Sequence, residues 1–228
     1  MIVEVIATSV EDAKRAEQGG ADRLELITGI LEGGLTPSWG LAEAVVKAVS
    51  IPVNVMIRPH SQSFCYNQDD LRVMREDVRV IREIGAAGIV IGMLTEEGTI
   101  DQRGLEMLLS EADGLDVTFH RAFDEAADHF AALQVLLGYP QVRHLLTSGG
   151  QKNALDGAER IASLVERTKH TQLSILAGSG LTLDNVGGLI AKTGVKEVHV
   201  GTGVRTGGQA LQYVDVEKVR ELKQRFQL

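Results

Sequence analysis

Residues 117–124, Val-Thr-Phe-His-Arg-Ala-Phe-Asp, read as a short β-strand that ends on a histidine–arginine pair and turns into a helix within a few residues. Strand ends of this kind carry the chemistry in barrels built of repeated strand–helix units, because the loops after the strands gather at one face. Two questions follow: whether the rest of the chain supplies such a barrel, and which groups meet His120 and Arg121 there.

Short β-rich runs alternate with longer amphipathic segments along the whole chain of 228 residues. The expected strands are residues 2–6, 23–27, 53–57, 88–91, 116–119, 144–147, 173–177 and 197–201. The expected helices are residues 10–18, 39–49, 69–84, 102–111, 126–137, 154–167, 183–192 and 216–225. These repeated units, with no low-complexity linker, predict one domain over residues 1–228. Its expected fold is a single TIM-type (β/α)8 barrel of the α/β class. The alternative, an open doubly wound sheet, requires a glycine-rich dinucleotide loop after the first strand, where Ala7-Thr8-Ser9 stands.

Capping residues mark several of the expected helix ends. Asp101 and Asp215 precede the fourth and eighth helices, and Thr182 and Asp184 stand at the start of the seventh. Glycines end three others, at Gly19-Gly20, Gly85 and Gly194.

Composition limits the classes of partner. Hydrophobic residues make up 44% and charged residues 24%, as in a globular protein with a full core. The net charge of −8 argues against nucleic-acid affinity and against an anionic membrane surface. The first residues lack the basic start and long apolar core of a signal peptide. The single cysteine, Cys65, excludes an internal disulfide and any multi-cysteine metal site. We therefore expect a cytoplasmic protein with no nucleic-acid or membrane partner.

Alternation within the expected strands predicts a polar barrel interior. Glu4 and Glu25 each stand between two apolar neighbours, and side chains alternate faces along a strand. The apolar face must pack on the helices, so the other face points into the barrel. Buried unpaired carboxylates are very costly, so the interior groups must pair with each other or hold a ligand. The expected interior residues are Glu4, Glu25, Asn54, Met56, Arg58, Thr118, His120, Glu197 and His199.

More than one interpretation stands for each chemical group in this interior. Glu4 and Glu25, on adjacent strands, can share a proton, bind a metal, or simply clamp Arg58. His120 is either a general acid/base or metal ligand, or a histidine hydrogen-bonded to Glu4 or Glu25 that closes the barrel top. Arg121 has the opposite parity; it either holds an anionic group or pairs with Asp124 in the turn.

Glycine-rich loops follow the last three expected strands. Loops after strands seven and eight of many barrels bind phosphate through backbone N–H groups, and only small residues let the backbone come that close. Tight turns without a ligand are the alternative. The candidate anion-binding residues are Ser148, Gly149, Gly178, Gly180, Gly201 and Gly203.

Two further loops lie on the same face. In residues 32–38, Thr36 or Ser38 can cap the next helix, with Pro37 fixing its entry. Residues 58–67 are long enough, with two aromatic residues, to act as a lid. Cys65 in that loop reads as a packed thiol rather than a nucleophile.

Several motifs together resemble one known family. These are residues 32–38 (Glu-Gly-Gly-Leu-Thr-Pro-Ser), 57–59 (Ile-Arg-Pro), 64–66 (Phe-Cys-Tyr), 118–124 (Thr-Phe-His-Arg-Ala-Phe-Asp), 146–150 (Leu-Thr-Ser-Gly-Gly) and 197–199 (Glu-Val-His). In this order, over nearly the whole chain, they resemble the CutC family, the copper homeostasis proteins. The resemblance implies a TIM-type barrel, a cytosolic location, a homo-oligomer (dimer or tetramer), and copper binding and tolerance.

The chain departs from the family pattern where copper would bind. Members proposed to bind copper(I) use cysteines after the first strand and near the second, where this chain has Ile6-Ala7-Thr8-Ser9 and Leu26-Ile27-Thr28. Thiolate and thioether ligands select copper(I). Only Cys65, Met56 and Met93 remain as sulfur ligands, and their spacing in the sequence does not gather them at one site. The remaining candidate metal ligands are His120 and His199, which with Glu4 and Glu25 suit Zn²⁺ or Mn²⁺ better.

Three functions remain open from the sequence. The first is a copper-homeostasis protein that binds a metal ion. The second is an enzyme acting on a small anionic metabolite, a carboxylate or phosphate, with Arg58 and Arg121 as the anion clamp and His120, oriented by Glu4 or Glu25, moving a proton. The third is a scaffold whose polar interior only fixes its packing. The candidate catalytic residues are Glu4, Glu25, Arg58, His120, Arg121, Asp124 and His199.

Overall fold

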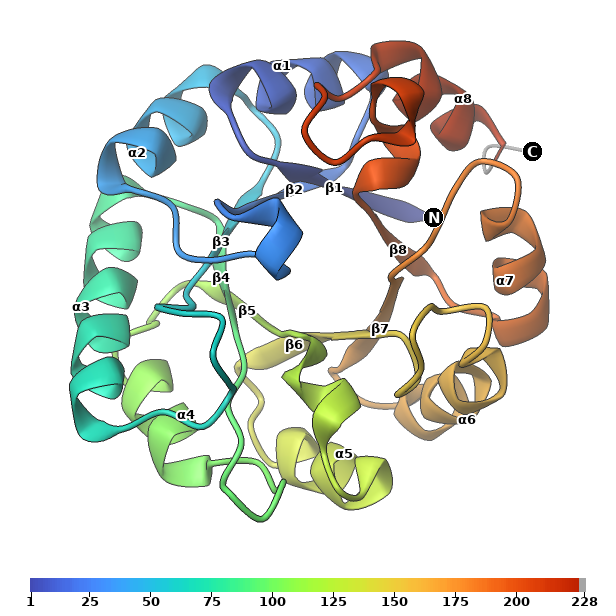
Figure 1. The fold of residues 1–228 in the computed structure, drawn as a ribbon. Helices are drawn as coiled ribbons and strands as arrows, with labels where there is room; N and C mark the ends of the chain where they lie inside the picture. Colours follow the sequence, from blue (N-terminus) through green and yellow to red (C-terminus); the bar gives the residue numbers. More distant parts are fainter. Residues whose placement is uncertain (226–228) are drawn as a thin grey trace.

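The computed structural model describes residues 1–225 and contains a closed barrel of parallel strands in the order β1 to β8 (Figure 1). This confirms the predicted TIM-type (β/α)8 barrel. Each predicted strand is present, with its ends within two residues of the prediction. The strands are β1 (Ile2–Ala7), β2 (Arg23–Leu26), β3 (Val53–Met56), β4 (Gly88–Ile91), β5 (Asp116–Phe119), β6 (Val142–Thr147), β7 (Ser174–Gly178) and β8 (Glu197–Val200).

The helices surround the barrel on its outside (Figure 1). They are α1 (Val10–Gly19), α2 (Trp39–Ala48), α3 (Gln68–Ile84), α4 (Gln102–Leu109), α5 (His129–Leu137), α6 (Ala158–Thr168), α7 (Val186–Thr193) and α8 (Val216–Gln224). Three of them, α5, α6 and α7, begin three or four residues later than predicted. Residues 121–125 form a separate 3-10 helix, so α5 starts only after its cap Asp128. α6 starts after Gly157, a position where an added Cβ would lie 1.9 Å from the Ser148 carbonyl oxygen.

The capping predictions hold at most helix ends. Asp101 and Asp215 accept backbone N–H bonds at the starts of α4 and α8, and Gly20, Gly85 and Gly194 adopt the left-handed conformation after α1, α3 and α7. Ser38, rather than Thr36, caps α2. At α7 the prediction was wrong. That helix begins after Asn185, whose side chain accepts the N–H of Thr182, so neither Thr182 nor Asp184 is its cap.

Strand parity places the polar residues inside the barrel as predicted. The outward-facing Val3, Val5, Leu24 and Leu26 are fully buried in the core between strands and helices. Glu4 is in register with Arg23 of β2 and with His199 of β8, while Glu25 pairs with Ile6 one layer higher. A small apolar cluster made of Ile27, Met56 and Val90, with Ile6 and Ile30 packed against it, lies apart from the main core. In the part of the chain that the structure describes, no helix is long and apolar enough to cross a membrane.

Candidate active site at the barrel mouth

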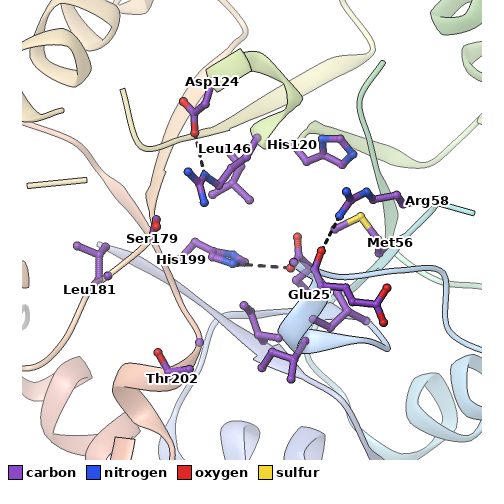
Figure 2. A pocket seen from close by; sticks show the side chains of 18 of the residues that line it. Glu25, Met56, Arg58, His120, Asp124, Leu146, Ser179, Leu181, His199 and Thr202 are labelled. Atoms are coloured by element: carbon purple, nitrogen blue, oxygen red, sulfur yellow. Dashed lines mark hydrogen bonds and ion pairs between the residues drawn. The ribbon is translucent and has the colours of Figure 1, made fainter. Parts of the chain in front are cut away.

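A cavity of about 550 Å³ opens at the carboxyl ends of the strands, where the βα loops gather (Figure 2). Glu25 and His199 line it from β2 and β8. Arg58 and His120 approach from one side in the figure, and Ser179 and Leu181 from the other. Most of the predicted catalytic residues therefore share one space, and of the predicted set only Glu4 does not line it.

Glu4, Glu25 and His199 form a buried cluster at this cavity. The Nδ1 of His199 lies 2.8 Å from Glu4 Oε1, and its Nε2 lies 3.7 Å from Glu25 Oε2. Burial raises the pKa of the Glu25 carboxyl to about 7, although the His199 charge opposes this shift. Burial also lowers the pKa of His199, but Glu25 and Glu4 outweigh it, so the net shift is upward. The cluster thus holds an exchangeable proton near neutral pH.

Arg23, one layer lower in the barrel than Glu25, holds Glu4 in its charged form. Arg23 donates from Nε to Glu4 Oε2 at 2.5 Å. Burial alone would raise the pKa of the Glu4 carboxyl, but Arg23 and His199 lower it to about 2. An ionised Glu4 accepts the Nδ1–H of His199, which leaves Nε2 of the imidazole facing Glu25.

Arg58 does not meet the carboxylates that were predicted to clamp it. Its NH1 donates to the carbonyl oxygens of Glu32 and Gly34 at 3.0 and 3.2 Å, and its guanidinium stacks on the Phe64 ring at 4.6 Å. The Nε atom is buried without a partner, and within residues 1–225 no carboxylate pairs with this side chain. β3 ends at Met56, so the chain has already turned toward residues 32–36 when it reaches Arg58. Arg58 is therefore a buried cation facing neutral acceptors.

His120 is also not bonded to Glu4 or Glu25. Its Nδ1 accepts the N–H of Ala122 at 3.1 Å, and its ring packs against Phe64 at 5.0 Å between centroids. Burial, with help from Arg58, lowers the pKa of His120 to about 3. The neutral ring therefore carries its proton on Nε2, which is buried and has no hydrogen-bond partner among residues 1–225. In this form His120 offers a hydrogen-bond donor at neutral pH.

Arg121 pairs with Asp124, one of the two arrangements that the sequence allowed. Arg121 Nε donates to Asp124 Oδ2 at 2.8 Å, and its NH2 donates to Ser148 Oγ at 3.0 Å. Asp124 also accepts the N–H groups of Ser148 and Gly150, which lie in the loop after β6. The carboxylate of Asp124 therefore occupies the place where we expected an external anion.

The backbone N–H groups that were predicted to bind an anion after β6 already have acceptors within the protein. The N–H of Ser148 is taken by Asp124, and the N–H of Gly149 donates to Thr147 Oγ1 at 2.9 Å. Ser148 and Gly149 are therefore not free to bind a ligand through their backbone. This part of the anion-site prediction was wrong, because a side chain from the preceding loop supplies the negative charge.

The loops after β7 and β8 do reach the cavity. Gly180 and Gly201 line it. Packing requires Gly203, because an added Cβ would lie 2.0 Å from the Leu181 carbonyl oxygen, whereas at Gly178 an added Cβ would meet the end of the Leu146 side chain at 2.7 Å. In residues 1–225 the N–H groups of Gly180 and Thr202 donate to no protein acceptor. Ser179, between Gly178 and Gly180, has φ of +83°, a backbone conformation that is uncommon and costly for a residue with a side chain.

Comparison with known proteins places the chain in a family. The model of the CutC family matches residues 1–204. This chain belongs to the CutC family. A CutC family protein of Photobacterium profundum is 43% identical over 198 residues, covering 87% of this chain and 80% of that protein. The human copper homeostasis protein cutC homolog is 39% identical, covering 97% of this chain and 87% of the relative.

Solved structures agree with the CutC assignment. The crystal structure of a CutC protein from Streptococcus agalactiae superposes with a TM-score of 0.82 at 30% identity, covering 87% of this chain and 97% of that one. Thiamine phosphate pyrophosphorylase from Pyrococcus furiosus superposes with a TM-score of 0.64 at 16% identity, which shows a shared fold alone.

The metal donors of this CutC chain do not fit copper(I). In the described residues the one group of three ligand-type side chains is Glu4, Glu25 and His199, whose donor atoms lie within 4.8 Å of one another. His120 stands outside it. Cys65 is exposed on its loop rather than packed as predicted, and it does not belong to the group. Two carboxylates and an imidazole are donors for harder divalent ions, whereas soft sulfur ligands select copper(I).

Sequence reasoning missed two interior residues of the CutC barrel, Arg23 and His144. Arg23 contacts Glu4, Glu197 and His144, and burial leaves its side chain 10% exposed. Both residues stand at the first position of a predicted strand, and neither belongs to the expected interior set. The signal was present, because Arg23 has the same parity as Glu25 and must share its face.

Proposed function

We propose that this CutC-family chain is an enzyme that transfers a proton to or from a small anionic molecule at the barrel mouth. The observation that carries the proposal is Glu25, a buried carboxyl with a pKa of about 7 that lines the cavity beside His199. A general base works best when its pKa lies near the working pH, and strongly shifted groups in clefts mark functional sites.

Arg58 supports an anionic substrate. It is a buried cation whose acceptors are carbonyl oxygens, so an incoming carboxylate or phosphate would supply the missing countercharge. His120 and Arg58 both contact the Phe64 ring, and the unpartnered Nε2–H of His120 offers a second donor on this side. Arg121 serves less well as the clamp, because Asp124 already neutralises it.

The proposed division of labour follows from these contacts. Arg58 and His120 hold the anionic group, Glu25 takes or gives the proton, and the His199 imidazolium stabilises negative charge that develops next to it. Glu4 orients His199 through Nδ1. Removal of a proton beside a carbonyl, as in isomerases and lyases, is the reaction class that requires these parts.

Deuterium exchange tests this proposal without a known substrate. The protein is incubated in D₂O with a panel of small keto acids, hydroxy acids and sugar phosphates, and incorporation of deuterium at carbon is followed by NMR. Glu25→Gln should lower the exchange rate of any responding compound by about 100-fold or more. Glu125→Gln, at the rim of the same cavity, is the matched control and should have little effect.

The pH profile supplies an independent check. Exchange should rise as Glu25 ionises through about pH 7. Exchange that is absent across the panel, combined with no binding of inorganic phosphate or small carboxylates, would refute the proposal. Exchange that survives in Glu25→Gln would refute the role of Glu25.

A second candidate function is the binding of a divalent metal ion. The human and mouse relatives, which are named copper homeostasis proteins, are consistent with this function. The observation that favours it is the buried group of Glu4, Glu25 and His199. The residues would hold Zn²⁺, Mn²⁺ or Cu²⁺ rather than Cu⁺. A cytoplasmic location and a homo-oligomeric state belong to the same proposal and rest on the family resemblance.

Calorimetric titration separates the metal ions. Zn²⁺ should bind with release of protons, because the Glu25–His199 pair must give up its proton, and His199→Asn should abolish the binding. Cys65→Ser is the matched control and should leave the affinity unchanged. A Cu⁺ affinity that depends on Cys65 would contradict this candidate.

A further inference from the structure

Arg58 is held so that one edge of its guanidinium stays free. Its NH1 group donates to the carbonyl oxygens of Glu32 and Gly34 at 3.0 and 3.2 Å. The Nε–H and NH2 groups lie along another edge of the same planar, rigid fork. Among residues 1–225 neither of these two groups has a hydrogen-bond partner, and Arg58 lines the cavity. This edge is therefore available to a ligand.

The loop after β2 and the Phe64 ring fix this orientation. Gly33 and Gly34 have φ of +85° and +98°, a backbone conformation that glycine adopts without strain. The N–H of Arg58 donates to Thr36 Oγ1 at 2.8 Å, and its carbonyl oxygen accepts the N–H of Thr36 at 3.0 Å. Phe64 covers one face of the guanidinium, 4.6 Å from the ring centroid. An incoming group can therefore pair with the free edge but not with NH1.

His120 adds an uncharged donor on the same side of the cavity. Its Nδ1 accepts the N–H of Ala122 at 3.1 Å, so the ring proton is on Nε2, which has no partner in the described part of the chain. His120 and Arg58 both contact the Phe64 ring, and Figure 2 shows them at one side of the cavity. The two side chains together offer three N–H donors and one positive charge.

We propose that the anionic group held at Arg58 is a carboxylate, so that the barrel mouth takes small carboxylic acids rather than phosphate esters. This inference rests on the proposed function and narrows its substrate class. A carboxylate is planar and carries one negative charge, and its two oxygens match two N–H groups along one edge of a guanidinium. Pairing with Nε–H also removes the cost of burying this donor without an acceptor.

The charges around the cavity favour a ligand with one negative charge. Within residues 1–225 the arginine and lysine side chains that line it are Arg58 and Arg121, and Arg121 is already paired with Asp124 at 2.8 Å. His199 lies between two carboxyl groups. Glu32, whose carbonyl oxygen accepts from Arg58, also lines the cavity and adds a carboxylate. A phosphate dianion would therefore bring a second negative charge that no unpaired arginine or lysine balances.

The backbone donors of the mouth do not complete a phosphate site at Arg58. Phosphate sites in proteins commonly use several backbone N–H groups around the anion. In the loop after β6, the N–H groups of Ser148 and Gly149 already have acceptors. The unbonded N–H groups of Gly180 and Thr202 belong to the loops after β7 and β8, and Figure 2 shows Thr202 across the cavity from Arg58. The cation and the free backbone donors thus lie on opposite sides.

Titration of the full chain with matched anions tests the inference without turnover. Propionate and pyruvate are compared with methyl phosphate and inorganic phosphate at pH 7.5 and constant ionic strength, and ¹H–¹⁵N NMR follows the arginine Nε–H signals. The carboxylates should bind about tenfold more tightly than either phosphate, and they should shift the Nε–H signal of Arg58.

Two variants separate the shape of the arginine from its charge. Arg58→Lys assigns the signal and keeps the charge but removes the edge with two donors, so it should weaken carboxylate binding by about tenfold or more. Arg121→Lys, at the second arginine of the cavity, is the matched control and should stay within about threefold of the wild type. Circular dichroism checks that both variants fold.

Phosphates that bind as tightly as the carboxylates would overturn the inference, while an anionic substrate would still stand. Carboxylate binding that survives in Arg58→Lys would also overturn it. Binding of neither class would overturn it together with the anion clamp of the proposed function. The comparison of the two anion classes uses the wild-type chain, so it decides the inference even if Arg58→Lys does not fold. Because it measures binding alone, its failure is distinguishable from a failure of the deuterium-exchange test.

Discussion

Asp124 shows how a single side chain can replace a ligand. Its carboxylate accepts the hydroxyl of Thr147 at 2.5 Å, the N–H groups of Ser148 and Gly150, and the Nε of Arg121. Burial would raise the pKa of this carboxyl, but these donors outweigh burial and lower it. The loop after β6 is therefore shaped around an internal anion, and the open part of the mouth lies toward β7, β8 and Arg58.

Asp124→Asn should destabilise the fold by about 2 to 3 kcal/mol, because several donors lose a charged acceptor. The lowered pKa means that the ionised form adds stability above the unfolded pKa of about 4, and that this part is lost as the pH falls through the folded value. Urea denaturation at pH 7 and pH 3 measures both effects. Asp156→Asn, on an exposed turn, is the control. A variant as stable as the control at pH 7 would contradict the prediction.

At the scale of the elements, periodicity in the sequence predicted the strands well and their connections less well. The alternation around Glu4 and Glu25 identified the interior face, because parity is a local property of extended chain. Arg58 does line the cavity, but its predicted partners were wrong, since β3 ends at Met56 and the backbone of Arg58 then bonds to Thr36. A loop–loop contact between segments 22 residues apart has no periodic signal.

Local sequence patterns also could not predict which side chains pair across the barrel. Arg23 and Glu197 are separated by 174 residues in the chain, and only the closed register of β8 against β1 brings them together. The 3-10 helix at Arg121–Glu125 likewise turns Asp124 back onto the loop after β6, which converted a predicted ligand site into an internal contact. The residue types of the site could thus be predicted, whereas their pairing depended on the three-dimensional register.

At the scale of the whole molecule, closure of the barrel depends on contacts between the first and last units. Asp12 and Arg205, separated by 193 residues, form a buried ion pair at 3.0 Å between Oδ2 and NH2. Asp12 also accepts the N–H of Val214, and Arg205 donates to the carbonyl oxygen of Ile6 at 3.2 Å. This pair ties the loop after β8 to the first strand–helix unit, beside the β1–β8 seam.

Breaking this buried pair should cost far more than breaking an exposed one. Asp12→Asn and Arg205→Met should each destabilise the fold by about 3 to 5 kcal/mol, because each leaves a buried polar partner unsatisfied. The double variant should lose about 1 to 3 kcal/mol less than the sum, since the second change removes the orphaned partner. Urea denaturation followed by circular dichroism gives all the values, with the exposed pair Glu43–Lys47 as a control worth about 0.5 kcal/mol or less. Strictly additive losses would contradict the prediction, because they would show that the two side chains stabilise the fold independently rather than as a pair.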